Sequence, residues 1–122
     1  MSIIAYNINS LAKEIHNQNK RWWYDLWTGK KLDRNFGELI ALCHSELSEA
    51  LEGDRKTLMD DKLPHRTMVE VELADCIIRI LDTAYGKGYI DIGGAIEEKL
   101  IYNQTREDHQ EEARKLYGGK KY

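Results

Sequence analysis

One helix-length segment, residues 71–82 with the sequence VELADCIIRILD, constrains the fold of this chain more than any other. Eight of its twelve residues are apolar, which is typical of a helix in a protein core. Its charged residues recur at spacings of three, four and three, so they lie on one narrow stripe of an α-helix. They are Glu72, Asp75, Arg79 and Asp82. A buried helix of this kind needs partners for its charges.

Helical periodicity runs through most of the 122 residues, and no segment alternates apolar and polar residues as a half-buried strand does. We therefore predict an all-α fold, a bundle of four to five helices in a single domain. The core of this domain is predicted to cover about residues 10–106, followed by a charged tail over residues 107–122. For the tail, a short solvated helix and partial disorder both stay open.

The predicted helices span about residues 10–23, 35–52, 67–86 and 91–106. We expect Gly53 to end the second of them. Thr67 and Glu70 have the spacing of a capping box at the start of the third. Asp91 is a candidate cap for the fourth, whose apolar residues are expected to face inward. These residues are Ala95, Ile96, Leu100 and Ile101.

The composition is that of a soluble protein and excludes several classes. A net charge of −3 argues against a dedicated nucleic-acid-binding protein, because such proteins usually carry a basic excess. The two cysteines, Cys43 and Cys76, lie in apolar helical patterns without metal-site spacing, which predicts small core residues. No segment approaches the roughly 20 apolar residues of a membrane span, and no signal peptide is evident. We therefore expect a cytoplasmic location.

Two predicted helices each carry a pair of carboxylates spaced three residues apart. Glu46 and Glu49 share one helix face, and so do Glu72 and Asp75. The intervening residues 50–71 allow the two helices to pack antiparallel, which would bring the four carboxylates together. Such a cluster repels itself unless protons or a divalent cation neutralise it. Oxygen-only ligation favours Mg²⁺, with Mn²⁺ as a substitute.

Two other interpretations of these charges remain open. Glu46 and Glu49 would also suit a solvated helix face. Arg79 would pair with Asp75 or Asp82 if the charged stripe were a purely structural ladder of ion pairs. A di-iron helical bundle is disfavoured, because no Glu is followed three residues later by His.

At this point the sequence resembles the MazG-like all-α nucleoside triphosphate pyrophosphohydrolases, in particular small single-domain members of the dUTPase/dCTPase-like type. That family carries E-x-x-E on one helix and E-x-x-D on the next. The segments SELSEALEG and ELADCIIRILD resemble it, and EEKLIYNQTR resembles its K-x-x-x-N-x-x-R segment. The resemblance covers about residues 10–106. The matching residues are Glu46, Glu49, Glu72, Asp75, Lys99, Asn103 and Arg106.

The resemblance implies an enzyme that uses Mg²⁺ to cut a nucleoside triphosphate between its α- and β-phosphates. A deoxynucleotide substrate and a role in clearing surplus or damaged nucleotides are implied with it. It also implies a homo-oligomer, usually a dimer or tetramer. From the chemistry, a carboxylate not fully used as a metal ligand would take the proton of the attacking water, and we expect this of Glu49.

Lys99, Asn103 and Arg106 occupy positions i, i+4 and i+7 and so share one face of the last helix. The lysine and arginine are expected to bind the triphosphate, and the asparagine is expected to contact phosphate or sugar. The alternative is the solvated basic end of a helix, which the helix dipole favours.

The segment NKRWWYDLW holds all three tryptophans of the chain. Each would serve either as a core anchor or as a wall for stacking a base. In the family that the chain resembles, a His and a Trp of the first helix region contact the base. His16 and either Trp22 or Trp23 occupy comparable places, and Asn19 would read the edge of a pyrimidine. For His16 a purely structural role also stays open.

The rival hypothesis is a non-catalytic helical module of the same fold that binds a nucleotide or a protein. The complete set of four carboxylates favours the enzyme. Neither hypothesis predicts a membrane partner or a nucleic-acid partner.

Overall fold

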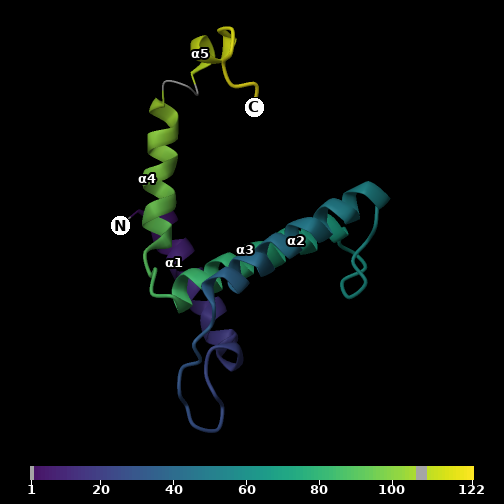
Figure 1. Cartoon of the computed structure of the whole chain (residues 1–122), viewed down its shortest axis with the longest axis vertical. Helices are drawn as coiled ribbons and strands as arrows, with labels where there is room; N and C mark the ends of the chain where they lie inside the picture. Colours follow the sequence, from purple (N-terminus) through teal and green to yellow (C-terminus); the bar gives the residue numbers. More distant parts are fainter. Residues whose placement is uncertain (1, 107–109) are drawn as a thin grey trace. The chain divides into compact units, whose positions relative to one another are not determined.

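The computed structural model describes residues 2–106 and 110–122. The chain folds into helices, and the described part contains no strand, only two isolated β-bridges. The all-α prediction is therefore confirmed. The helices, shown in Figure 1, are α1 (Ile3–Gln18), the short 3₁₀ helix η1 (Lys20–Trp22), α2 (Phe36–Lys56), α3 (Met68–Gly86), α4 (Ile92–Thr105) and α5 (Glu111–Lys115).

The contacts within the chain form two compact units. One unit comprises residues 10–90 and holds α2 and α3. The other comprises the chain up to residue 9 and from residue 91 onward, with the start of α1 and α4. Each unit is described by itself below.

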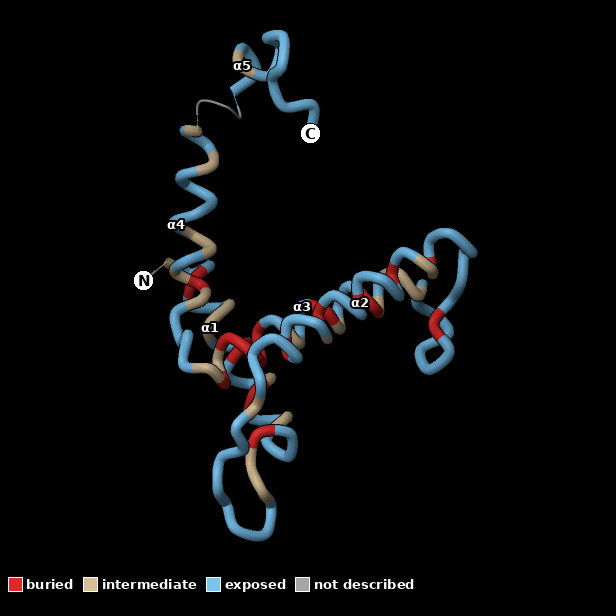
Figure 2. Tube along the Cα trace, viewed as in Figure 1, coloured by how far each residue is buried: buried red, intermediate tan, exposed pale blue. Residues whose placement is uncertain are grey.

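The first unit is built on α2 and α3, which pack along their length as an antiparallel pair (Figure 1). Buried residues of α2 recur at spacings of four and three, which is the seam expected where one helix packs on another. These residues are Leu39, Cys43, Glu46, Ala50 and Gly53. The Cys76 thiol of α3 lies 3.5 Å from the Cys43 carbonyl oxygen, so both cysteines are core residues as predicted. Figure 2 shows buried positions along both helices of the pair.

Gly53 does not end α2, contrary to the prediction. The helix continues to Lys56, and Thr57 in the left-handed conformation, at φ 53°, follows it. A Cβ atom on Gly53 would lie 2.8 Å from Cβ and Cγ of Met68. This glycine therefore allows the close approach of the chain at the start of α3, which is a packing role and not a capping role.

The structure contains both N-terminal helix caps that the sequence predicts. Thr67 and Glu70 form the predicted capping box at the start of α3, with the Glu70 amide donating to Thr67 Oγ1 at 3.1 Å. Asp91 caps α4 by accepting a hydrogen bond from the Gly94 amide at 3.0 Å. α1 begins at Ile3, about two turns earlier than predicted.

In the second unit, the first turns of α1 pack against the start of α4. Asn9 donates to Asp91 at 2.8 Å and accepts a hydrogen bond from the Gly93 amide at 2.7 Å. A Cβ on Gly93 would lie 2.3 Å from the Ala5 carbonyl oxygen, so only glycine fits there. Further along α4, Leu100 and Ile101 are 50% and 58% exposed, which contradicts the prediction that they face inward.

Of the predicted charged tail, residues 107–109 lie outside the described residues. The five residues of α5 form a short exposed helix with an ion pair between Glu111 and Lys115 at 2.8 Å. No helix in the described part of the chain is long and apolar enough to cross a membrane.

Candidate metal centre

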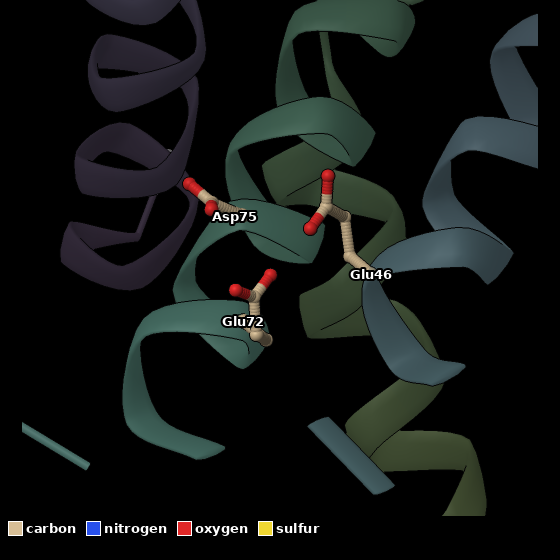
Figure 3. A group of neighbouring side chains, drawn as sticks. All are labelled: Glu46, Glu72 and Asp75. Atoms are coloured by element: carbon tan, nitrogen blue, oxygen red, sulfur yellow. The ribbon is translucent and has the colours of Figure 1, made fainter. Parts of the chain in front are cut away.

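Three carboxylates meet between α2 and α3. Glu46 projects from α2, and Glu72 and Asp75 project from successive turns of α3 (Figure 3). One oxygen from each lies within 4.8 Å of the others. Antiparallel packing of α2 on α3 produces this convergence, because it brings the middle of α2 beside the first half of α3. The predicted meeting of the two carboxylate pairs thus holds for three of the four members.

The cluster lies mostly out of solvent. Glu46 is 8% exposed and Glu72 is 9% exposed. Glu72 Oε2 is buried and has no hydrogen-bond partner among the described residues. A buried carboxylate oxygen without a donor costs free energy, so an arrangement of this kind is stabilised by a cation or a proton. The donor set is oxygen only, which is the chemistry that Mg²⁺ and Mn²⁺ prefer.

The pKa values of the clustered carboxylates are shifted by their burial and by one another. A hydrogen bond with Glu46, together with burial and the nearby Glu49, raises the pKa of Glu72 to about 8. Burial also pushes the pKa of Glu46 upward, but hydrogen bonds from Glu72 and Arg79 outweigh it and hold that pKa below its ordinary value. Without a metal ion, Glu72 therefore carries a proton at neutral pH while Glu46 is ionised.

Arg79 pairs across the two helices and not along its own stripe. Its Nε donates to Glu46 Oε1 at 2.8 Å, whereas the sequence suggested Asp75 or Asp82 as partner. The cross-helix contact places a positive charge at the edge of the carboxylate cluster. The difference arises because helix packing brings Glu46 within reach, which spacing along one helix does not reveal.

Glu49 remains at the margin of the cluster. It is exposed on α2 and is not one of the three converging carboxylates. It is nevertheless close enough to contribute to the raised pKa of Glu72 by hydrogen bonding and charge. Burial, then the charge of Glu46, likewise raises the pKa of Asp75.

A pocket of about 420 Å³ opens beside the cluster. Its size falls in the range of small-molecule sites. Carboxylates, two arginines, an amide and an aromatic ring line it together with two aliphatic side chains. The lining residues are Asn19, Trp22, Arg34, Leu42, Glu46, Asp75, Ile78, Arg79 and Asp82.

Asp82 joins the end of α1 to α3. Its buried carboxylate accepts hydrogen bonds from Trp23 Nε1 at 3.0 and 3.1 Å and from Asn19 Nδ2 at 3.3 Å. It lies 2.9 Å from His16 Nδ1. This network sets one wall of the pocket, because it fixes the segment that carries Asn19 and Trp22.

The predicted base-contacting residues therefore divide into two groups. Asn19 and Trp22 line the pocket, and Trp22 is 55% exposed. Trp23 is 1% exposed and is a core anchor bonded to Asp82. His16 is also buried, packed against Trp23 and Tyr85. In this conformation neither Trp23 nor His16 presents a free ring face to a ligand in the pocket.

Lys99, Asn103 and Arg106 belong to the second unit. Lys99 Nζ lies 4.6 Å and the Arg106 guanidinium carbon 5.9 Å from the centre of the Tyr102 ring. Asn103 Oδ1 is buried without a hydrogen-bond partner among the described residues. Lys99 and Asn103 also line an apolar groove of about 310 Å³ on α4. Their predicted role toward phosphate stays a prediction.

The sequence patterns did not indicate Arg34 as a site residue, nor the partners of Asp82. Arg34, which directly precedes the N-cap of α2, lines the pocket, and no spacing pattern pointed to it. Asp82 stood on the charged stripe, but its partners lie far away in the sequence, His16 in α1 and Asn19 and Trp23 on either side of η1.

Comparisons with family models, with curated proteins and with solved structures give no match.

Proposed function

We propose that this protein is a Mg²⁺-dependent nucleoside triphosphate pyrophosphohydrolase of the MazG-like type. It would cut the bond between the α- and β-phosphates, most readily in a deoxynucleotide, and act in the cytoplasm on surplus or damaged nucleotides. The observation that carries the proposal is the cluster of Glu46, Glu72 and Asp75 within 4.8 Å, with an unpartnered buried oxygen on Glu72.

Each residue of the site has a role in this proposal. Glu46, Glu72 and Asp75 would hold Mg²⁺, which when bound neutralises phosphate charge and acidifies water. Glu49 is exposed at the margin and is free of the converging set, so it suits the task of accepting a proton from water. In the neighbouring pocket, Trp22 offers a partly exposed ring for stacking on a base.

We further propose that the protein is a homo-oligomer. Apolar side chains of α2 and α3 are 37–60% exposed and form one stripe on each helix. Their positions put both stripes on the side of the helix pair opposite Asp75 and Asp82. The stripe residues are Phe36, Ile40, Leu47, Leu51, Leu73, Ile77 and Ile80. A contiguous apolar face of this kind is typical of a surface that another protein surface covers, here a second copy of the chain.

The oligomer is tested by light scattering after size-exclusion chromatography. The wild-type protein should elute as a dimer or tetramer, and Leu47→Glu should shift it toward the monomer. The matched control is Leu26→Glu, since Leu26 is 75% exposed in a loop outside the apolar face. A wild-type monomer at every concentration would contradict this part of the proposal.

The activity is tested with a panel of ribo- and deoxynucleoside triphosphates, with Mg²⁺ and with EDTA. We expect pyrophosphate release that EDTA abolishes. Release of single phosphates would mean that the cleavage position is wrong. If folded protein released nothing even with Mn²⁺, the non-catalytic binding module would become the better hypothesis.

The link between cluster and activity is tested with Glu72→Gln. This change should abolish turnover and Mn²⁺ binding while leaving the protein folded, because Glu72 is already protonated in the metal-free protein. The matched control is Glu14→Gln, an exposed residue of α1 that accepts a hydrogen bond from Gln18. Equal Mn²⁺ binding by both variants would exclude the cluster as the metal site.

A further inference from the structure

Arg34 is held at the rim of the pocket by an aromatic ring. It is partly buried, and its guanidinium carbon lies 5.1 Å from the centre of the Trp23 ring. Trp23 is itself fixed, because it is 1% exposed and its Nε1 donates to Asp82. A guanidinium that stacks on an immobile indole loses little further freedom when it binds a ligand.

The charge of Arg34 has no carboxylate partner among the described residues. None of the ion pairs and side-chain hydrogen bonds there involves its guanidinium. Arg79, the other arginine of the pocket, is instead engaged by Glu46 at 2.8 Å. Five N–H donors in a planar fork are therefore available at Arg34.

Arg34 lines the same pocket as Glu46 and Asp75. A metal ion held by those carboxylates would attract an anion into the pocket, and Arg34 supplies a second positive group there. Phosphate matches this pair of groups, because it bridges metal ions well and accepts two parallel hydrogen bonds from a guanidinium.

We propose that Arg34 binds a phosphate group of the ligand that occupies this pocket, with Trp23 holding the guanidinium in place. This inference rests on the proposed metal-dependent function and adds to it a phosphate-binding residue in the same unit as the carboxylates. Arg34 is thus a binding residue, and Trp23 is a positioning residue that acts through it.

The test measures binding of inorganic tripolyphosphate by calorimetry in the presence of Mn²⁺. Arg34→Met keeps an apolar chain against Trp23 and removes the charge, and Arg34→Gln keeps a planar group. We expect the affinity of either variant for tripolyphosphate to be lower by about tenfold or more, because each loses a charge-assisted pair of hydrogen bonds. The matched control is Arg55→Met, since Arg55 is exposed in the last turn of α2, away from the pocket lining.

Mn²⁺ binding without tripolyphosphate separates the two proposals. If the wild-type protein does not bind Mn²⁺, the proposed function fails. If Mn²⁺ binds normally and a folded Arg34 variant binds tripolyphosphate as tightly as Arg55→Met does, the role of Arg34 is wrong.

A measurement on the wild-type protein tests the same proposal without depending on whether the variants fold. Phenylglyoxal modifies accessible arginines, and mass spectrometry of the peptides locates the modified sites. Tripolyphosphate with Mn²⁺ should protect Arg34 and leave Arg55 reactive. Equal reactivity of Arg34 with and without tripolyphosphate, at concentrations where calorimetry shows binding, would overturn the proposal.

Discussion

Arg79 Nε donates a 2.8 Å hydrogen bond to Glu46 Oε1, and this contact joins α3 to α2 at the edge of the carboxylate cluster. Together with the hydrogen bond from Glu72, this pair holds the pKa of the nearly buried Glu46 below its ordinary value. It also means that a metal ion entering the cluster meets one ionised carboxylate that already has a cationic partner.

Arg79→Gln should therefore lower the free energy of unfolding of the metal-free protein more than that of the metal-loaded protein. Loss of the charge-assisted bond should cost about 1 kcal/mol, at the low end of its range because the Arg79 side chain is 41% exposed. Urea unfolding at pH 7 with EDTA measures this loss. With saturating Mg²⁺ the difference from wild type should shrink, because the cation replaces the missing charge. An equal loss in both conditions would contradict the explanation.

Stability without metal should fall as the pH rises toward 8. The folded-state pKa of Glu72 is about 8 and its ordinary value is 4.5, so the folded protein binds this proton more tightly than the unfolded chain does. The contribution is complete below pH 4.5 and is lost as the pH rises through about 8. Melting temperatures in EDTA, compared between wild type and Glu72→Gln, measure it. The variant should show a smaller decline over this range.

Removing the Asp82 carboxylate should destabilise the protein strongly. Asp82→Ala leaves the buried Trp23 indole without its acceptor and breaks the contact with His16. The expected loss is about 3 kcal/mol, as for a buried polar group that loses its partner. Urea unfolding provides the measurement, and Asp61→Ala is the exposed control. A loss below that of the control would mean that the network is not formed.

Gly53→Ala should destabilise the α2–α3 pair although alanine is the better helix former. The added methyl group would lie 2.8 Å from Met68 Cβ, and overpacking typically costs about 1–3 kcal/mol. The gain in helix propensity, about 1 kcal/mol, offsets only part of this. Thermal unfolding with Ser48→Ala as the exposed control in the same helix gives the comparison. A higher melting temperature than that of the wild type would show that the Met68 side chain moves aside at little cost in free energy.

Sequence patterns predicted those features that depend on neighbours within about one helical turn. The all-α class, the capping box of Thr67 and Glu70, and the cap at Asp91 are of this kind. The pairing of Glu72 with Asp75 on one face is local as well. Their convergence with Glu46 was predictable because the connection between the two apolar helices, residues 57–67, allows them to pack antiparallel.

Only the tertiary structure determined which side chains meet across helices. Gly53 was predicted to end a helix, but packing places it against Met68. For Trp23 the sequence left a core anchor and a stacking wall open, and packing places it in the core. The partners of Arg79 and Asp82 lie 33 or more residues away in the sequence. Periodicity shows the face of a helix on which a residue lies. It does not show which residue of another helix lies opposite. That depends on the register and rotation of the two helices, which the close packing of their side chains determines.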